Sequence, residues 1–323
     1  MHTTDTIYGS FDIGEAVLHD LIVSPEVQRL KGVWQHGMPP RYIPSVTHTF
    51  TRYEHSIGVM LLLRVLGASL EEQIAGLLHD VSHLAFSHLY DWVVAEELLS
   101  GDRHTSGQDA RHNDYLIQSS LPSILSSHGY SLQTFLDYKQ FTLLEQETPE
   151  LCADRVDYCL REMEADEAKG YVSALKAQDR KIVFADKDSA LGFAQYFLSR
   201  NRDFWASYDL GSRYMILKNV LRYAIKKDVV KLSDFYGGDE DIMRKVEQMS
   251  DTFVIHNLRL LRNVRIPNTD HGVPVKLKLR YVDPLFIEDG HLQRLARVDV
   301  AFAREVEDER ATLMKPILVH DVV

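Results

Sequence analysis

Histidines and carboxylates that could bind a metal are concentrated in one short stretch, from Arg52 to Asp91. In chain order it contains His55, the adjacent pair His79-Asp80, His83 and His88. Neutral imidazole and ionised carboxylate suit first-row divalent metals such as Mn, Fe, Co, Ni and Zn. An unpaired polar group inside a protein costs on the order of 2–7 kcal/mol, and a bound cation offsets that cost. The stretch therefore predicts a metal site.

Two buried helices have to position these groups. The first covers roughly Glu54–Leu66 and is apolar almost all round, which is typical of a helix inside a core. The second begins near Leu70, after Ser69 as a good N-cap, and ends at His79-Asp80. A lone histidine on an apolar helix is more often a core residue bonded to a carbonyl. The prediction of a metal site depends on the combination with Asp154, which lies in a third helix.

The same residues carry a resemblance to a known family. In order, the chain contains SPEVQRLKGVWQHG, FTRYEHSIGV, AGLLHDVSHLAFSH and ADRVDYCLRE. This pattern resembles the HD-domain metal-dependent phosphohydrolases, and within them the deoxynucleoside triphosphate triphosphohydrolase branch, from residue 5 to residue 235. The resemblance implies a mainly α fold, the HD-domain helical bundle. It also implies one divalent metal ion (Mn, Fe, Mg, Ni, Co or Zn), held by His55, His79, Asp80 and Asp154.

Residues next to the predicted ligands are placed for proton transfer. His83 follows His79 by four residues, so both would face one side of a continuing helix. His88 and Asp91 are three apart and could pair, the carboxylate then setting the tautomer and basicity of the imidazole. The resemblance implies that His88 donates a proton to the leaving group with support from Asp91, and that His83 and His112 contact phosphate. The alternative for each histidine is an ordinary surface or supporting role.

Most of the cationic residues that we expect to bind phosphate are identified through the resemblance. Arg52, three residues before His55, matches a phosphate-contacting arginine of the family, and Arg213 aligns with another. On one expected helix, cations recur every four residues at Lys218, Arg222 and Lys226. They would form either a ridge toward a polyphosphate or a solvated helix face.

Recognition of the sugar also follows from the resemblance. Gln35 matches a residue used on the sugar hydroxyl, and Tyr158 matches an aromatic that packs under the sugar and excludes a 2′-hydroxyl. Glu162 stands where the family commonly has Asp, while His36 and Met38 replace smaller residues beside Gln35. The pocket could therefore accept a different sugar or a different number of phosphates.

Composition places the chain among globular proteins. It has 323 residues, 45% of them hydrophobic, enough for a substantial core. Its 36 basic and 47 acidic residues give a net charge of −11, which disfavours nucleic acid as a partner because a nucleic-acid binder needs a basic face. Cys152 and Cys159 lie two helical turns apart, about 10 Å, too far for a disulfide. With no apolar leader and no run of ~18 apolar residues, we expect a cytoplasmic protein without a membrane span.

The expected elements change character near residue 236. Before it we expect helices almost throughout, with a proline-containing loop over 37–51 and a polar segment over 101–113 that is either a lid or a surface loop. After it, the alternating KLKLRYVD at Lys276–Asp283 predicts a half-buried strand, with partners near 285–287 and 298–302. We predict an HD phosphohydrolase helical domain over 1–235 and a small α+β appendage over 236–323.

Together these observations predict a metal-dependent phosphohydrolase that acts on a nucleotide. By the resemblance, metal-bound hydroxide attacks the phosphorus of a deoxynucleoside triphosphate, releasing nucleoside and triphosphate, and the enzyme is a homo-oligomer. One alternative with the same metal site is a phosphatase acting on a nucleoside monophosphate or a sugar phosphate. Another is a catalytically silent nucleotide-binding regulator, against which the His88 and Asp91 pair argues because a binding module needs no proton donor.

Overall fold

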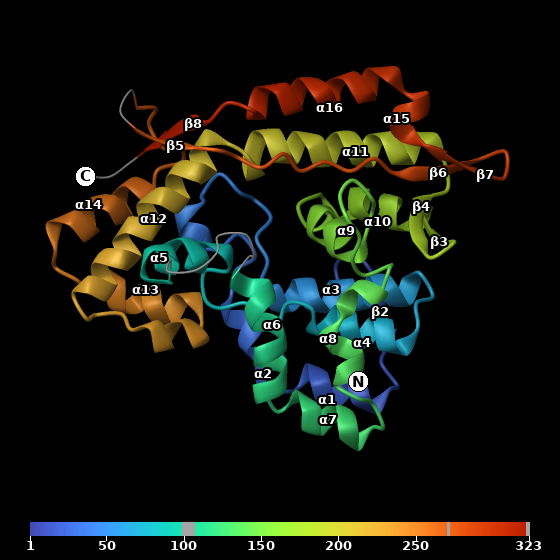
Figure 1. The fold of residues 1–323 in the computed structure, drawn as a ribbon, viewed down its shortest axis with the longest axis horizontal. Coiled ribbons are helices and arrows are strands. Elements are labelled where there is room, and N and C mark those ends of the chain that lie inside the picture. The colour runs from blue at the N-terminus through green and yellow to red at the C-terminus, as the bar shows by residue number, and fades with distance from the viewer. Residues whose placement is uncertain (99–106, 270–271, 321–323) are drawn as a thin grey trace.

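The computed structural model describes residues 1–98, 107–269 and 272–320, and this part of the chain is mainly helical with a few short strands. The predicted fold class is therefore confirmed. In Figure 1 an upper layer made of α11 (Lys187–Arg200) and α16 (Val300–Leu313) runs across the molecule above two groups of helices. None of the described helices is both long enough and apolar enough to cross a membrane.

The first group of helices supplies the predicted metal ligands. Its centre is α3 (Arg52–Val65), which packs against α4 (Leu70–Leu78) and α9 (Ala153–Leu160). Thr51 and Glu54 form a capping box that fixes where α3 begins, and the Ser69 hydroxyl accepts the Glu72 N–H at the start of α4. Around this centre lie α1 (Ala16–Ile22), α2 (Pro25–Arg29), α6 (Gly107–Gln118), α7 (Leu121–Ser127), α8 (Gln133–Leu136) and α10 (Ala165–Ala174).

The second group has a hydrophobic core of its own. Its longest helix is α12 (Tyr208–Lys226), which packs against α5 (His88–Leu98) and α14 (Thr252–Leu261), with α13 (Asp239–Glu247) beside them. A single π-helical turn, Asn201–Trp205, joins α11 to this group. The two cores meet at the segment between α4 and α5, which carries two predicted metal ligands, His79 and Asp80, and the predicted catalytic residue His83.

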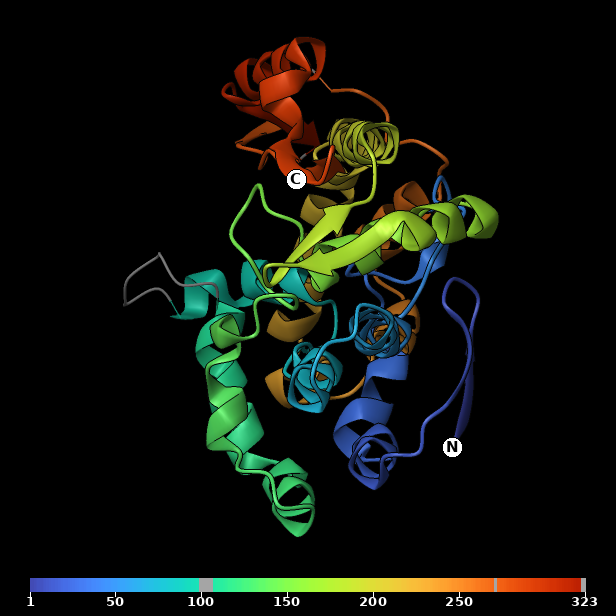
Figure 2. The same cartoon turned by 90° about the vertical axis from the view of Figure 1, so that its right-hand side faces the viewer.

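Three small sheets complete the described chain. At the N-terminus, β1 (His2–Asp5) pairs antiparallel with β2 (Gly9–Asp12). The largest sheet has the order β3 (Leu175–Gln178), β4 (Lys181–Phe184), β6 (Leu285–Glu288) and β7 (His291–Arg294), with β4 and β6 parallel. In the third, β5 (Gly272–Val275) pairs antiparallel with β8 (Ile317–His320). Figure 2 shows β3 and β4, in yellow-green, between α11 and the blue helices of the first group.

The C-terminal third differs in part from the sequence prediction. The strand at 285–287 is present as β6, but Lys276–Asp283 forms no ladder and runs extended between β5 and β6. The prediction of a strand at 298–302 is wrong, because this region contains the end of α15 (Leu295–Val298) and the start of α16. The boundary at residue 236 stays a prediction, although β6 pairs with β4 across it.

Two further predictions concern the polar segment 101–113 and the two cysteines. Of the polar segment 101–113, residues 101–106 lie outside the described part of the chain, and the rest belongs to α6 rather than to a loop. The two cysteines are free thiols, both buried, as expected from their separation.

Candidate metal centre and active-site cavity

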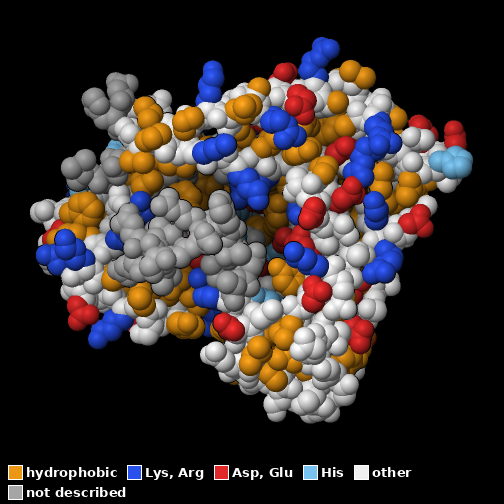
Figure 3. All heavy atoms as spheres, in the orientation of Figure 1, with side chains coloured by type: hydrophobic (Ala, Val, Ile, Leu, Met, Phe, Trp, Pro, Cys, Tyr) orange, Lys and Arg blue, Asp and Glu red, His pale blue; other side chains and the backbone are white. Residues whose placement is uncertain are grey.

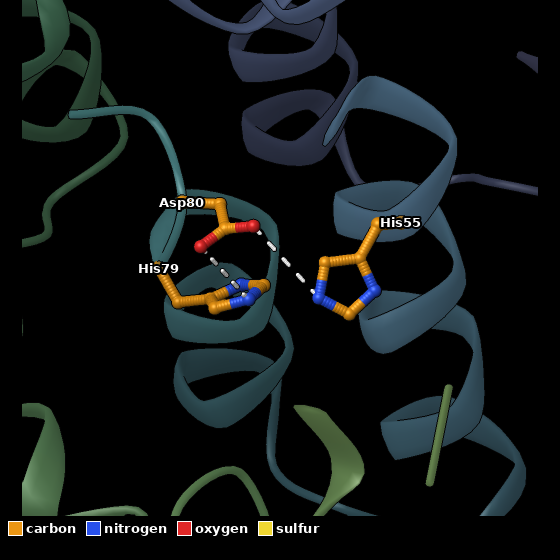
Figure 4. A group of neighbouring side chains, drawn as sticks. All are labelled: His55, His79 and Asp80. Carbon is orange, nitrogen blue, oxygen red and sulfur yellow. Dashed lines mark ion pairs between the residues drawn. The ribbon is translucent and has the colours of Figure 1, made fainter. Parts of the chain in front are cut away.

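The four predicted metal ligands meet at one point. His55 lies one turn into α3, His79 and Asp80 directly follow α4, and Asp154 lies in the first turn of α9. The Nε2 atom of His55 is 3.0 Å from Asp154 Oδ1 and 3.8 Å from Asp80 Oδ2, and His79 Nε2 is 3.5 Å from Asp80 Oδ1. Figure 4 shows the side chains of His55, His79 and Asp80 pointing into the gap between α3 and the end of α4.

The hydrogen bond made by Nδ1 fixes the orientation of the His55 and His79 rings. His55 Nδ1 donates to Asp157 Oδ2 at 2.7 Å, and His79 Nδ1 donates to the Gly76 carbonyl at 2.7 Å. When the imidazoles are neutral, Nε2 is then the nitrogen of each ring that can bind a metal. Within the described residues, His79 Nε2 is buried without a hydrogen-bond partner. The ligand atoms of His55, His79 and Asp80 lie within 4.8 Å of one another, and Asp154 adjoins His55, so the donor set fits one divalent metal ion.

Asp157 anchors the centre from behind, and sequence reasoning missed it. Besides the His55 ring, this fully buried carboxylate accepts hydrogen bonds from Tyr8 Oη at 2.8 Å and from Arg161 Nε at 2.8 Å. Arg161 in turn donates to Asp5 Oδ2 at 2.7 Å. The loop between β1 and β2 is therefore connected to a metal ligand through one carboxylate.

A glycine makes room for this anchor. A Cβ atom at Gly58, on the face of α3 that meets α9, would lie 2.1 Å from Asp157 Oδ1 and 2.0 Å from Arg161 Nη2. Any larger residue would displace the buried ion pair. Because Asp157 follows Asp154 by three residues, the two carboxylates share one face of α9, and this spacing was the available signal.

The charges of the cluster depend on one another. Burial by itself lowers the pKa of an imidazole, but the carboxylates Asp80 and Asp154 raise the pKa of His79 to about 9. Burial would raise the pKa of Asp80, yet the Arg52 guanidinium and His79 hold it well below its usual range. The protein without metal thus keeps a second proton on the His79 imidazole at neutral pH. Binding of a divalent ion has to displace this proton, so the metal affinity rises with pH.

Arg52 and His83 surround Asp80 on its other side. Arg52 Nη1 donates to Asp80 Oδ2 at 2.6 Å and its Nε donates to Ser87 Oγ at 3.1 Å. His83 Nε2 lies 3.3 Å from Asp80 Oδ1. The helix expected to continue from His79 to His83 instead ends at Leu78, and a turn brings His83 onto Asp80.

His88 opens α5 at the edge of the same site. Its ring lies 5.0 Å from the His83 ring, edge to face. Burial among the surrounding groups and the Arg52 charge lower the pKa of His88 to about 4, so the imidazole is neutral at pH 7. Asp91, the predicted partner of His88, instead accepts a hydrogen bond from Arg111 Nη2 at 2.8 Å. The predicted support of His88 by Asp91 is not formed as a direct hydrogen bond within the described residues.

Asp239, at the start of α13, is a second buried carboxylate that sequence reasoning missed. Its Oδ1 accepts the Phe86 N–H at 2.7 Å and its Oδ2 accepts the Trp34 N–H at 3.0 Å. These two backbone groups immediately precede Gln35 and Ser87. Desolvation in this fully buried position raises the pKa of Asp239 to about 7. One side chain therefore clamps together the two loops that border the site.

A cavity of about 630 Å³ opens from the metal centre, a size that admits a small-molecule substrate. Figure 3 shows this face hollowed below the layer of α11 and α16, with Lys and Arg side chains at the edge of the hollow. Aromatic rings and charged groups share its lining. Lining residues include Gln35, His36, Arg52, His79, Asp80, His83, His88, Glu145, Asp154, Arg155, Tyr158, Glu162, Phe197, Trp205, Tyr214, Lys278 and Arg280.

Comparison with known proteins agrees with this geometry. Residues 52–161 match the family model of the HD domain. The chain is 35% identical over 303 residues to the uncharacterized protein YdhJ of Bacillus subtilis, covering 90% of each chain. It is 37% identical over 215 residues to the metal-dependent phosphohydrolase cns2 of Cordyceps militaris, covering 63% of this chain and 60% of that protein. The chain belongs to the HD-domain metal-dependent phosphohydrolase family.

More distant similarities extend this picture. The deoxynucleoside triphosphate triphosphohydrolase SAMHD1 of Danio rerio is 30% identical over 145 residues, which cover 40% of this chain and 23% of that protein. A hypothetical protein from Aquifex aeolicus has the same fold, with a TM-score of 0.63 over 98% of this chain and 100% of that chain at 20% identity.

In this HD phosphohydrolase, the structure brings most of the predicted substrate residues to the cavity. Gln35, Arg52, Tyr158 and Glu162 all line it. The carboxylate of Glu162 is nevertheless held by protein partners: it accepts from Arg200 Nε at 2.7 Å and from Trp205 Nε1 at 2.9 Å. Glu162 therefore shapes the wall and positions these side chains.

Two predicted residues lie elsewhere. Arg213 is fully buried, pairs with Asp209 at 2.6 Å and donates to the carbonyls of Tyr42 and Leu261 at 2.7 Å each. Its guanidinium is committed to joining α12 to the end of α14, so we withdraw it as a phosphate ligand. His112, on α6, is buried with its Nδ1 atom 3.0 Å from Ser82 Oγ and is not among the lining residues of the cavity.

A second cluster of donor atoms in the HD phosphohydrolase is already occupied by a side chain. Glu145, Cys152 and Asp154 lie close enough together to suggest another ion site. Arg155 Nη2 donates to Glu145 Oε1 at 3.0 Å, and Arg155 Nη1 lies 3.0 Å from Cys152 Sγ. A guanidinium thus takes the place that a second cation would need.

Proposed function

We propose that this HD phosphohydrolase acts on nucleotides, with deoxynucleoside triphosphates as the leading substrate and nucleoside plus triphosphate as products. One observation carries the proposal: the metal centre and an aromatic compartment share one cavity. Tyr158 stands between them, with its ring 6.4 Å from the His55 ring and 5.4 Å from the Trp205 ring. A phosphate at the metal would therefore have its nucleoside beside Tyr158. SAMHD1, a distant relative, carries the same activity in its name.

Two polar atoms in the cavity wall support a hydroxyl-bearing ligand. Within the described residues, Gln35 Oε1 and His36 Nε2 are buried without a hydrogen-bond partner. Burial without a partner costs on the order of 1–3 kcal/mol per group. A sugar hydroxyl beside Tyr158 would satisfy them and recover that free energy on binding.

Different residues at the site would have different roles in this reaction. A divalent ion held by His55, His79, Asp80 and Asp154 supplies Lewis-acid chemistry and lowers the pKa of a coordinated water. Arg52 is placed to neutralise a phosphoryl oxygen. An anion next to Arg52 also cancels the positive charge that lowers the pKa of His88. Substrate binding thus favours a proton on the His88 imidazole, which can then pass to the leaving oxygen.

A phosphatase acting on a nucleoside monophosphate or sugar phosphate is the second candidate. The position of Arg213 favours it, because the guanidinium expected to bind phosphate is buried outside the cavity. A shorter phosphate chain needs fewer cations. The carboxylate of Glu162, tied to Arg200, is likewise less available to a sugar hydroxyl than the resemblance implied.

Product analysis separates these functions. The purified protein with Mn²⁺ is incubated with deoxynucleoside triphosphates, ribonucleoside triphosphates and monophosphates, beside an Asp80→Ala control. We expect nucleoside and triphosphate from the deoxynucleotides and nothing from the control. Orthophosphate released only from monophosphates would select the phosphatase, and no turnover with any divalent metal would leave a nucleotide-binding regulator.

The proposal includes a cytoplasmic location and a homo-oligomer, both predicted from the sequence. Size-exclusion chromatography with light scattering tests the second, with and without nucleotide. A monomer under both conditions would remove it.

A further inference from the structure

The extended segment 276–284 forms part of the cavity wall although it lies far along the chain from the metal ligands. It connects β5 with β6 and runs alongside α11, as the orange trace in Figure 1 shows. Two backbone hydrogen bonds hold it in place: Arg280 N–H donates to Asn201 Oδ1 at 2.9 Å, and Asp283 N–H donates to the Pro149 carbonyl at 2.9 Å. It is therefore a fixed wall.

The side chains of this segment divide between the first hydrophobic core and the cavity. Val282 belongs to the first hydrophobic core, and Leu279 and Tyr281 pack against it. Lys278 and Arg280 line the cavity that contains the metal centre. The period-two pattern does not produce strand pairing here, and the side chains do not alternate strictly, because Tyr281 also lines the cavity and Val282 is fully buried in the core.

These two cations differ from the others in the lining. Arg52 is paired with Asp80 at 2.6 Å and Arg155 with Glu145 at 3.0 Å. Neither Lys278 nor Arg280 forms an ion pair within the described residues. Once a divalent ion balances the carboxylates of its own ligands, these cations remain as positive charge without a counterpart in the wall.

The charge of Arg280 reaches the interior of the site. Burial raises the pKa of Tyr158 and of Tyr214, and the Arg280 guanidinium opposes this rise at both phenols. The same charge contributes to the lowered pKa of His88. An anion in the cavity would therefore gain attraction from Arg280 in a partly desolvated setting, where charge-assisted hydrogen bonds are strongest.

We propose that Lys278 and Arg280 bind the phosphates that extend beyond the one held at the metal centre, and so determine selectivity for a polyphosphate over a monophosphate. This inference rests on the proposed function, because it assumes that a phosphate is bound at the metal. The C-terminal segment thereby supplies the cations that Arg213 does not.

Binding of inorganic phosphates tests the assignment without requiring turnover. Titration calorimetry compares tripolyphosphate with orthophosphate, with Mg²⁺ in excess so that the ligand does not strip metal from the protein. The variants are Lys278→Gln with Arg280→Gln, and Arg280→Lys, which keeps the charge. Lys276→Gln is the matched control, since Lys276 is an exposed cation on the same segment that is not in the cavity lining.

We expect the double variant to bind tripolyphosphate roughly ten- to a hundredfold more weakly, with orthophosphate changed by less than about threefold. Arg280→Lys should retain most of the affinity, and Lys276→Gln all of it. Equal loss for both ligands, or no loss for either, would overturn the assignment.

Turnover of nucleotides by the same variants keeps the two proposals apart. If the wild-type protein hydrolyses no nucleotide but the selective loss of tripolyphosphate binding is observed, the proposed function fails and the anion site stands. If triphosphates are hydrolysed with the same KM by the double variant and the wild-type protein, the proposed function stands and this assignment fails.

Discussion

At the scale of single residues, metal binding depends on the side chains that hydrogen-bond to the predicted ligands as well as on the ligands themselves. Asp157 holds His55 in the tautomer that presents Nε2, and it is itself held by Tyr8 and Arg161. Partners of this kind raise ligand basicity and fix ring orientation. The metal centre is therefore sensitive to changes on α9 and in the N-terminal hairpin.

Asp157→Asn tests this dependence. The neutral amide keeps the shape but loses the charge that stabilises the His55 Nδ1–H, so we expect the metal affinity to fall roughly 10–100-fold. Competition with a fluorescent chelator measures it directly. Asp12→Asn, at an exposed carboxylate in the N-terminal hairpin, is the control. Equal affinities of Asp157→Asn and the wild-type protein would show that the carboxylate serves packing alone.

At the scale of elements, the site is bordered by loops that a distant helix holds in place. Phe86 and Ser87 have positive φ values of 64° and 50°, an uncommon conformation for residues with a side chain. Asp239 at the start of α13 accepts the Phe86 N–H and also the Trp34 N–H. Gly37 permits the close approach, because a Cβ there would lie 2.9 Å from the Phe86 carbonyl oxygen.

The pKa of Asp239 makes this clamp dependent on pH. Desolvation raises it from the ordinary value of 3.8 to about 7 in the folded protein. The folded state then binds more protons than the unfolded state, so the free energy of unfolding falls as pH rises between these two values. Asp239→Asn cannot ionise and should lack this decrease.

Urea denaturation of the two proteins at pH 5 and pH 7.5, with saturating Mn²⁺, measures the effect. The metal cluster titrates equally in both proteins and cancels in the difference. We expect the stability of Asp239→Asn relative to the wild-type protein to increase from pH 5 to pH 7.5. Parallel pH profiles would mean that Asp239 stays ionised throughout.

At the scale of the whole molecule, the predicted metal centre lies where three helices meet, two of them consecutive in the chain and the third far along it. His55 comes from α3, His79 and Asp80 from the end of α4, and Asp154 from α9. Without metal, carboxylates and imidazoles face one another in a buried cluster. A ligand that binds only the folded state stabilises it, by about 2.7 kcal/mol at a concentration of 100 Kd.

Removing the metal should therefore lower the thermal midpoint of unfolding. Differential scanning calorimetry with EDTA and with excess Mn²⁺ provides the comparison. We expect a higher midpoint with Mn²⁺ in the wild-type protein and little response in Asp80→Ala, which lacks one ligand. If the thermal midpoint of the wild-type protein is the same with EDTA and with Mn²⁺, the result would contradict a metal centre that links these helices.

The sequence by itself predicted four metal ligands and the helices that carry them. The apolar run around His55, the N-cap Ser69 and the spacing of the motifs are local signals, and they gave the mainly α fold and the family. In the structure the four side chains lie close together, and their role as ligands stays a prediction. Local patterns suffice there because helix periodicity and capping depend on neighbouring residues.

Only the tertiary structure decided which other residues reach the site. Arg213 looked like a phosphate ligand from its alignment, but packing buries it between α12 and α14. Asp239, Lys278 and Arg280 reach the site from elements more than 150 residues after Asp80. Neither periodicity nor spacing in the sequence predicts that these residues lie near the site, because their position depends on how the two helix groups and the extended segment pack together.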